Sequence, residues 1–295
     1  MWTVSGGRSK PPSRWRLPNR HHRRQMGPQT VCLASMRRFR WPPGSISILL
    51  PTAGQCPNPI TFIPHPGQYM NDDHAALAGF DGQARLFPFP NLVLFPHVVQ
   101  PLRIFEPRYR QMMVDALSDD GLIALVLLRP GWGEENYDDM PEIEPVACLG
   151  QIVWHEKLPD GRYNLRLKGL SRIRLEEEVP TDRLYRIARA ERVPDVVPAD
   201  LHRLKDLRRA LANAVLPRFA SDGTAQRQLR EIFQGDMSLG HVCDVLSYAL
   251  PLPLEMKQAL LAEPHVDVRA EIMTQALRVS AARSDRRFPP EFSDN

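Results

Sequence analysis

Short apolar runs interrupted by prolines dominate the middle of this chain. Residues 86–107 read LFPFPNLVLFPHVVQPLRIFEP and contain five prolines. Proline lacks a backbone N–H donor and favours an extended conformation in the residue before it, which excludes a continuous helix or one uninterrupted central strand. We therefore expect short extended pieces joined by sharp corners, an arrangement typical of small barrels.

A helical pattern and then a strand pattern follow this stretch. After Pro107, apolar residues recur at spacings of three and four, and proline is tolerated in the first turn of a helix. Gly121 breaks the pattern, and residues 121–128 (GLIALVLL) form an apolar run of strand length. The sequence thus predicts one helix inserted between strands.

A hairpin is predicted around Asp160 and Gly161, which separate two strand patterns and both accept positive φ. Gly169 allows a kink or bulge in the returning strand. Residues 185–193 (YRIARAERV) add one more short strand. The total is about six strands, which we expect to form a small closed or nearly closed barrel.

After Asp200, the spacing of the apolar residues becomes that of amphipathic helices, and Asp200 itself is a suitable N-cap. The predicted helices cover residues 201–216, 226–233, 238–250, 254–261 and 267–282. The whole pattern predicts an α+β fold with a barrel lobe over 84–196, a helical bundle lobe over 200–283 and a disordered tail over 284–295.

Residues 129–145 form a polar, acidic segment that we expect to be a surface loop. Loops carry binding functions more often than the elements they connect, and aromatic side chains provide large contact areas. Trp132 and Tyr137 in this loop are therefore candidates for ligand contact, with folding of the rings onto the barrel as the alternative.

Charge is distributed unevenly along the chain. Its 295 residues carry a net charge of +4. Residues 1–69 contain ten Lys or Arg and no Asp or Glu, so residues 70–295 carry a net charge of −6. The same segment is rich in proline and has no sustained period, so we expect disorder. Translation starting at Met70, a basic arm for nucleic acid and a targeting signal are the alternatives.

The four cysteines do not form a CxxC pattern, and Cys148 and Cys243 lie in apolar runs. This usage predicts buried free thiols in a cytoplasmic protein. Because no apolar run approaches 18 residues, we expect no membrane partner.

Residues suited to catalysis, metal binding or cofactor binding do not form a recognisable site. The chain contains no Gly-Lys pair and therefore no GxxxxGK[ST] phosphate loop. Its histidines lack HExxH spacing, and its acidic pairs fall in predicted loops. We expect no catalytic residue, no metal and no cofactor, and hence a protein that is not an enzyme.

The order of several blocks resembles the N-terminal substrate-binding domain of the Lon family of ATP-dependent proteases. These blocks are FPFPNLVLFPHVVQPLRIFEPRY (87–109), IALVLL (123–128), VACLGQIVWHEKLPDGRYNLRLKGLSRIRL (146–175) and LPLPLEMKQALLAEPHVDVRAEIMTQAL (250–277). The resemblance implies a barrel of the PUA type followed by helices. No block includes the ATPase or the Ser–Lys protease unit of that family.

This resemblance implies a non-catalytic adaptor that binds unfolded or damaged protein segments and docks to a separate protease or chaperone. The candidate peptide contacts are Phe95, Phe105, Trp132 and Tyr137, with core packing as the alternative for Phe95 and Phe105. RNA binding is the second hypothesis, since PUA-type barrels hold RNA elsewhere. Basic residues of the hairpin favour RNA binding (Arg162, Arg166, Lys168, Arg172 and Arg174). The net negative charge of the chain beyond residue 69 makes nucleic acid the weaker prediction.

Overall fold

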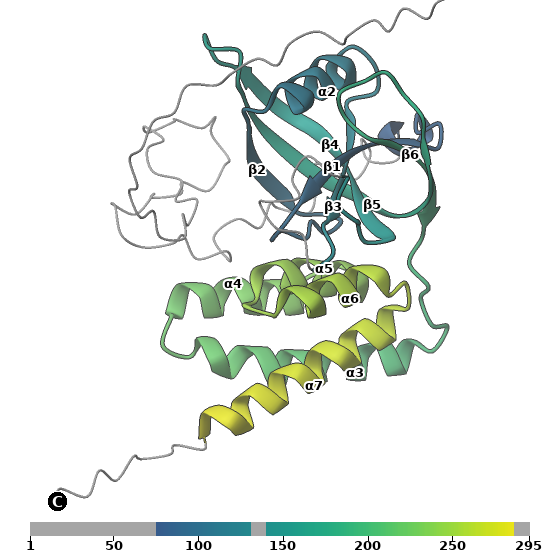
Figure 1. Cartoon of the computed structure of the whole chain (residues 1–295). Coiled ribbons are helices and arrows are strands. Elements are labelled where there is room, and N and C mark those ends of the chain that lie inside the picture. The colour runs from purple at the N-terminus through teal and green to yellow at the C-terminus, as the bar shows by residue number, and fades with distance from the viewer. Residues whose placement is uncertain (1–74, 131–139, 286–295) are drawn as a thin grey trace, which may run out of the picture. The chain divides into compact units, whose positions relative to one another are not determined.

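The computed structural model describes residues 75–130 and 140–285 (Figure 1). Within them, the strands are β1 (Gln83–Phe89), β2 (Val99–Ile104), β3 (Leu122–Leu127), β4 (Val146–Lys157), β5 (Tyr163–Val179) and β6 (Ile187–Val193). The helices are α2 (Pro107–Leu117), α3 (Leu201–Val215), η3 (Leu216–Phe219), α4 (Gly223–Gln234), α5 (Leu239–Ala249), α6 (Leu254–Ala262) and α7 (Val266–Asp285). This order confirms the predicted α+β fold, with one helix inserted among six strands and a helical lobe after them.

Two predicted disordered segments fall wholly or mostly outside this description. The extension over 1–69 lies outside the described residues, as does the predicted tail beyond residue 285. Across the described ranges, no helix combines the length and the apolar character needed to cross a membrane.

The long strand β5 closes the barrel. The sheet order is β2-β5-β4-β3-β1-β6, and β6 pairs with β5 as well as with β1. This second pairing completes a ring of β5, β4, β3, β1 and β6. It is possible because β5 has 17 residues: its first part pairs with β2, and its second part, beginning at Arg172, pairs with β6.

Small side chains fill one of the two cores of the barrel lobe. That core draws buried residues from all five strands of the ring and none from β2, which places it inside the ring. Alanine contributes five of these residues, and small side chains suit the narrow interior of a barrel with so few strands. The cluster consists of Ala84, Leu86, Leu122, Ala124, Val126, Ala147, Leu149, Leu170, Ile173, Ala188 and Ala190.

Prolines occupy positions where a missing N–H donor is tolerated. Pro101 lies in β2, whose described pairing is with β5 alone, so β2 is an edge strand. Between β1 and β2 the chain forms the predicted corner, where His97 has a positive φ of 66°. The helical lobe likewise follows local signals: the carboxylate of Asp200 caps α3 by accepting from the backbone N–H of His202 at 2.9 Å.

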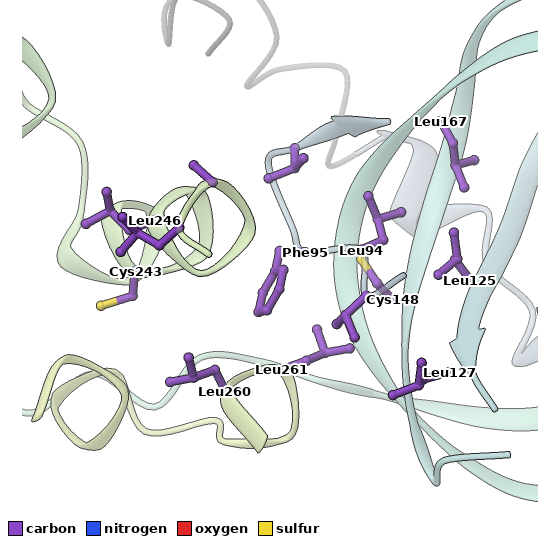
Figure 2. Packing of buried hydrophobic residues seen from close by; sticks show 14 of the residues in the cluster. Leu94, Phe95, Leu125, Leu127, Cys148, Leu167, Cys243, Leu246, Leu260 and Leu261 are labelled. Carbon is purple, nitrogen blue, oxygen red and sulfur yellow. The ribbon is translucent and has the colours of Figure 1, made fainter. Parts of the chain in front are cut away.

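A second hydrophobic core joins the barrel lobe to the helices. One cluster of buried side chains contains residues of the β1–β2 connection and of α5, α6 and α7. Figure 2 shows the ring of Phe95 between the barrel strands and the helices that carry Leu246 and Leu261. Because these side chains are shared, the two predicted lobes pack as parts of one structure.

In this joining region, Gly169 allows the backbone of β5 to lie directly against the backbone of the β1–β2 connection. The N–H of His97 donates to the carbonyl oxygen of Gly169 at 2.8 Å, and the N–H of Gly169 donates to that of Val98 at 2.8 Å. A Cβ on residue 169 would overlap the carbonyl group of Phe95 and lie 3.0 Å from the sulfur of Cys148. The register of β4 and β5 also shifts here, which confirms the predicted irregularity.

We expect Gly169→Ala to lower the free energy of unfolding by about 3 kcal/mol, because relieving the overlap requires a shift of the Phe95 backbone. Urea unfolding followed by circular dichroism measures the loss. Gly223→Ala is the control: a Cβ there meets no atom within 4 Å. Equal stabilities for the two variants would contradict this account of the corner.

Candidate functional site

A candidate binding site is an apolar groove in the helical lobe, which we call the α5–α7 groove. Its volume is about 1080 Å³. It is lined by Leu92, Arg218, Phe219, Tyr248, Ala249, Leu250, Pro251, Leu252, Pro253, Met256, Lys257, Ile272, Gln275, Ala276, Leu277 and Val279. Apart from Leu92, which follows β1, all of these residues come from η3, α5, α6, α7 and the α5–α6 connection.

Two prolines open the groove by ending α5. Leu250, the C-cap of α5, is extended, and Pro251 and Pro253 prevent the helix from continuing. The chain turns and begins α6 at Leu254. Apolar side chains such as Met256 and Ile272 are half-buried and line the groove instead of being fully buried in the core.

Polar side chains at the groove are few and specific. The hydroxyl of Tyr248 donates to the side-chain oxygen of Gln100 in β2 at 2.5 Å, which fixes the ring against the barrel. The ammonium of Lys257 donates to the backbone carbonyl of Tyr248 at 2.7 Å. Burial lowers the pKa of Lys257 and raises that of Tyr248. The groove therefore combines a wide apolar wall with a partly desolvated cation.

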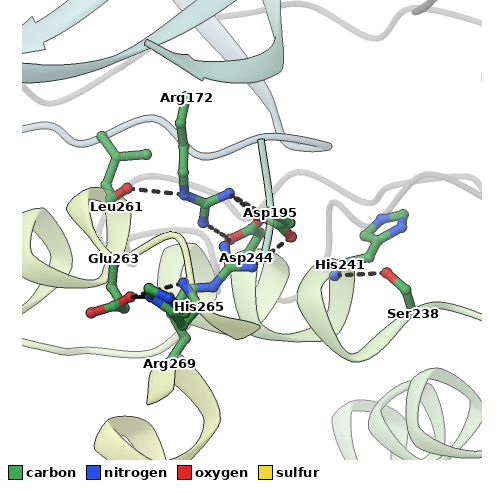
Figure 3. A network of polar contacts seen from close by, with 9 residues as sticks. All are labelled: Arg172, Asp195, Ser238, His241, Asp244, Leu261, Glu263, His265 and Arg269. Carbon is green, nitrogen blue, oxygen red and sulfur yellow. Dashed lines mark hydrogen bonds and ion pairs between the residues drawn. The ribbon is translucent and has the colours of Figure 1, made fainter. Parts of the chain in front are cut away.

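Four buried or half-buried charges hold the groove helices to the barrel (Figure 3). Arg172 of β5 binds the carboxylate of Asp244 in α5 and, at 3.0 Å, that of Asp195. Arg269 of α7 binds Asp244 at 2.8 Å and Asp195 at 2.6 Å. The Nε of Arg172 also donates to the carbonyl oxygen of Leu261 in α6 at 2.9 Å. One barrel arginine thus contacts two of the helices that form the groove and, through shared carboxylates, the third.

This ion network is built for structure rather than for reaction. Arg172, Asp244 and Arg269 have side chains no more than 2% exposed, so a substrate has no access to them. Two positive and two negative groups balance one another, as buried charges require. Burial raises the pKa of Asp244 to about 7, and the positive charge of Arg172 opposes that shift.

A stacked pair of imidazoles lies close to the network. The rings of His97, in the β1–β2 connection, and His241, in α5, are 4.0 Å apart between centroids. Burial lowers the pKa of His97 to about 3, and the neighbouring His241, Lys168 and Arg172 add to this shift. His97 is therefore neutral at neutral pH, and the stack joins the two lobes by packing.

The remaining candidates for chemistry are inert or dispersed. Burial raises the pKa of both Cys148 and Cys243, so both thiols stay protonated and unreactive. Among the residues whose side chains the structure describes, His, Cys, Asp and Glu do not gather in any group of three that could hold a metal ion.

Of the four predicted peptide contacts, Phe95 and Phe105 fall within the described residues, and the structure places them in different environments. Phe95 has no exposed surface and packs in the core that joins the lobes. Phe105, just beyond β2, is 62% exposed but does not line the α5–α7 groove. Trp132 and Tyr137 lie outside the described residues. Sequence reasoning missed the groove itself, although the LPLP repeat at 250–253 could have indicated its corner.

The basic hairpin residues do not form one exposed face. Lys168 and Arg172 are buried, and Arg172 belongs to the ion network. Arg162 pairs with Asp160, and Arg166 lies over the ring of Trp154 at 5.1 Å. The sequence grouped these residues as support for RNA binding, but the folded structure buries two of them.

Comparison with known proteins decides the family. A family model described as the ATP-dependent protease La (LON) substrate-binding domain matches residues 83–279. The chain belongs to this family. The Lon substrate-binding domain is a non-catalytic part of the proteases that carry it, and its match covers both the barrel and the helices of the α5–α7 groove.

Curated relatives of this Lon domain are longer proteins. Lon protease 2 of Myxococcus xanthus is 26% identical over 195 residues, which cover 65% of this chain and 23% of that protein. Lon protease of Anaeromyxobacter dehalogenans (strain 2CP-C) is 26% identical over 199 residues, covering 65% of this chain and 22% of that protein. The chain therefore spans less than a quarter of the length of these relatives.

A solved structure shares the fold of this Lon domain. The N-terminal domain of the Mycobacterium avium complex Lon protease matches with a TM-score of 0.51 and 13% sequence identity. The match covers 66% of this chain and 98% of that one. At this identity the likeness shows the fold alone.

We expect Arg172→Met to lower the free energy of unfolding by about 3–5 kcal/mol, because it leaves the buried carboxylate of Asp244 with one arginine partner instead of two. Thermal and urea unfolding measure the loss. The control is Arg189→Met, which removes an exposed ion pair with Glu177 and should cost less than about 1 kcal/mol. Similar losses for both variants would contradict the assigned role of the network.

The neutral state of His97 predicts a pH dependence. Its pKa is about 3 in the folded protein, against 6.5 for the ordinary group, so below pH 6.5 the unfolded chain binds a proton that the folded chain excludes. Stability contributed by neutral His97 is therefore present above pH 6.5 and is lost as pH falls toward 3. The loss reaches at most about 1.4 kcal/mol per pH unit.

His97→Asn isolates this effect, since asparagine tolerates the positive φ and does not titrate in this range. Urea unfolding at a series of pH values from 7.5 to about 4 should show that the wild type loses more stability than the variant. Parallel pH profiles would mean that His97 is charged in the folded protein or does not influence stability.

Proposed function

We propose that this protein is a substrate-recognition module that binds apolar segments of unfolded or damaged proteins in the α5–α7 groove. The observation that carries the proposal is the groove itself, about 1080 Å³ and mostly apolar, on a Lon substrate-binding domain. Apolar segments are buried in folded proteins and become exposed on unfolding. A groove that binds them distinguishes damaged proteins from intact ones.

The chemistry of the wall supports recognition of many sequences. Burial of apolar area is non-directional and contributes about 25 cal/mol per Å², so it rewards apolar character rather than a particular sequence. Met256 has a flexible, polarisable side chain that adapts to partners of different shape. Leu252 and Ile272 add further apolar surface. Broad selectivity of this kind suits a module that must accept unrelated clients.

The wider role that we propose is that of an adaptor in protein quality control. The region of the chain that matches the family model is the substrate-binding domain. We propose that unfolding and cleavage of a bound segment are carried out by a separate ATP-dependent protease or chaperone in the same compartment, which we take to be the cytoplasm. The groove supplies selection, and the partner supplies energy and cleavage.

Charge substitutions in the groove test the proposal. We expect Met256→Glu and Ile272→Glu each to weaken binding of a fluorescein-labelled peptide rich in Leu, Val and Phe by at least about tenfold, roughly 1.4 kcal/mol, because a buried carboxylate loses its water. Fluorescence anisotropy with the full chain measures the dissociation constant.

The matched control is Val153→Glu, on an exposed position of β4 that does not line the groove. It should bind the peptide as the wild type does, and unfolding curves establish that all three variants are folded. Equal weakening by Val153→Glu, or unchanged binding by both groove variants, would place peptide recognition elsewhere and overturn the proposal.

A further inference from the structure

The charged side chains that line the α5–α7 groove have one sign. Arg218 of η3 and Lys257 of α6 are cationic, and among the described residues that line the groove none is Asp or Glu. This bias does not follow from composition, since the chain from residue 70 onward carries a net charge of −6. Glu255 lies in the first turn of α6 but is not part of the groove lining.

Lys257 is partly desolvated and is stabilised in the structure by neutral groups. Its ammonium donates to the carbonyl oxygen of Tyr248 at 2.7 Å and lies 5.9 Å from the centroid of the Tyr248 ring. An ammonium has three N–H donors, and a carbonyl dipole compensates for lost water less well than a carboxylate does. Burial accordingly lowers the pKa of Lys257. A carboxylate that reaches this position gains more than it would at a fully hydrated lysine.

We propose that the groove selects apolar segments that carry Asp or Glu side chains beside their apolar residues, with Lys257 as the principal carboxylate partner and Arg218 as a second cationic contact. This inference rests on the proposed function, because it specifies which apolar segments the same groove prefers. The apolar wall provides affinity by burial, and the two cations provide selectivity among apolar segments.

Acidic side chains fit the groove better than a terminal carboxylate. Arg218 and Lys257 come from different elements, η3 and α6, that contribute to the same groove. An internal segment can present acidic side chains at two positions, whereas the end of a chain carries one carboxylate. Basic flanking residues would meet like charge and bind more weakly. The preferred substrate is therefore an internal acidic and apolar segment.

Four labelled peptides with one apolar core test this selectivity by fluorescence anisotropy on the full chain. Three end in an amide and differ in their flanking residues, which are Asp, Asn or Lys. The fourth has Asn flanks and a free C-terminal carboxylate. We expect the Asp peptide to bind about tenfold more tightly than the Asn peptide, the Lys peptide to bind more weakly, and added salt to reduce the advantage of Asp.

Lys257→Met identifies the partner. We expect it to abolish most of the preference for Asp over Asn, measured as the ratio of the two dissociation constants on the same variant, because methionine keeps the apolar stem of the side chain but lacks the charge. Lys257→Arg should retain the preference. Lys205→Met, at an exposed lysine of α3 that does not line the groove, is the matched control and should bind as the wild type does.

The outcomes separate this inference from the proposed function. If the Asn peptide binds, Met256→Glu weakens it, and Asp flanks add nothing, the selectivity is wrong while the apolar groove stands. A preference for Asp that survives Lys257→Met, or an advantage confined to the free carboxylate, also overturns the inference. If none of the peptides binds, the proposed function fails as well.

Discussion

The buried contact between Arg172 and Asp244 is the interaction on which the arrangement of the two lobes depends. Each charge has lost its water, and each would be strongly destabilising without its partner. Arg269 and Asp195 complete the set, so both carboxylates have two arginine neighbours. Hydrophobic packing around Phe95 brings the lobes together without strong directional preference. The ion network adds direction, since few arrangements of the lobes satisfy all four charges.

The same network determines where the groove lies. Its walls come largely from α5, α6 and α7, and each of these helices carries one atom group of the network: Asp244, the carbonyl of Leu261 and Arg269. The groove opens at the other end of this arrangement, where prolines force the chain from α5 into α6. A rigid set of buried charges and an adaptable apolar surface are thus built on the same three helices, which separates stability from recognition.

Local signals were sufficient to predict much of the fold. The Asp200 cap, the hairpin at Asp160 and Gly161 and the corners at the prolines all depend on residues close in sequence, where backbone sterics and short-range hydrogen bonds act alone. Arg172 shows the opposite case. The sequence placed it among basic hairpin residues that favoured RNA binding, but its side chain is buried and binds Asp244 of α5. Similarly, Phe95 and Phe105 have comparable surroundings in the sequence, yet one is fully buried and the other is 62% exposed.

The order of strands and helices, the expectation of a barrel and the resemblance to the Lon substrate-binding domain could all be predicted from the sequence, because periodicity, turn chemistry and ordered motifs are properties of neighbouring residues. Closure of the ring through β5, the partners of Arg172 and the position of the groove became visible in the folded structure. These depend on side chains far apart in the chain, such as Arg172 and Arg269. Whether a charge is buried or a leucine lines a groove is settled by what packs against it.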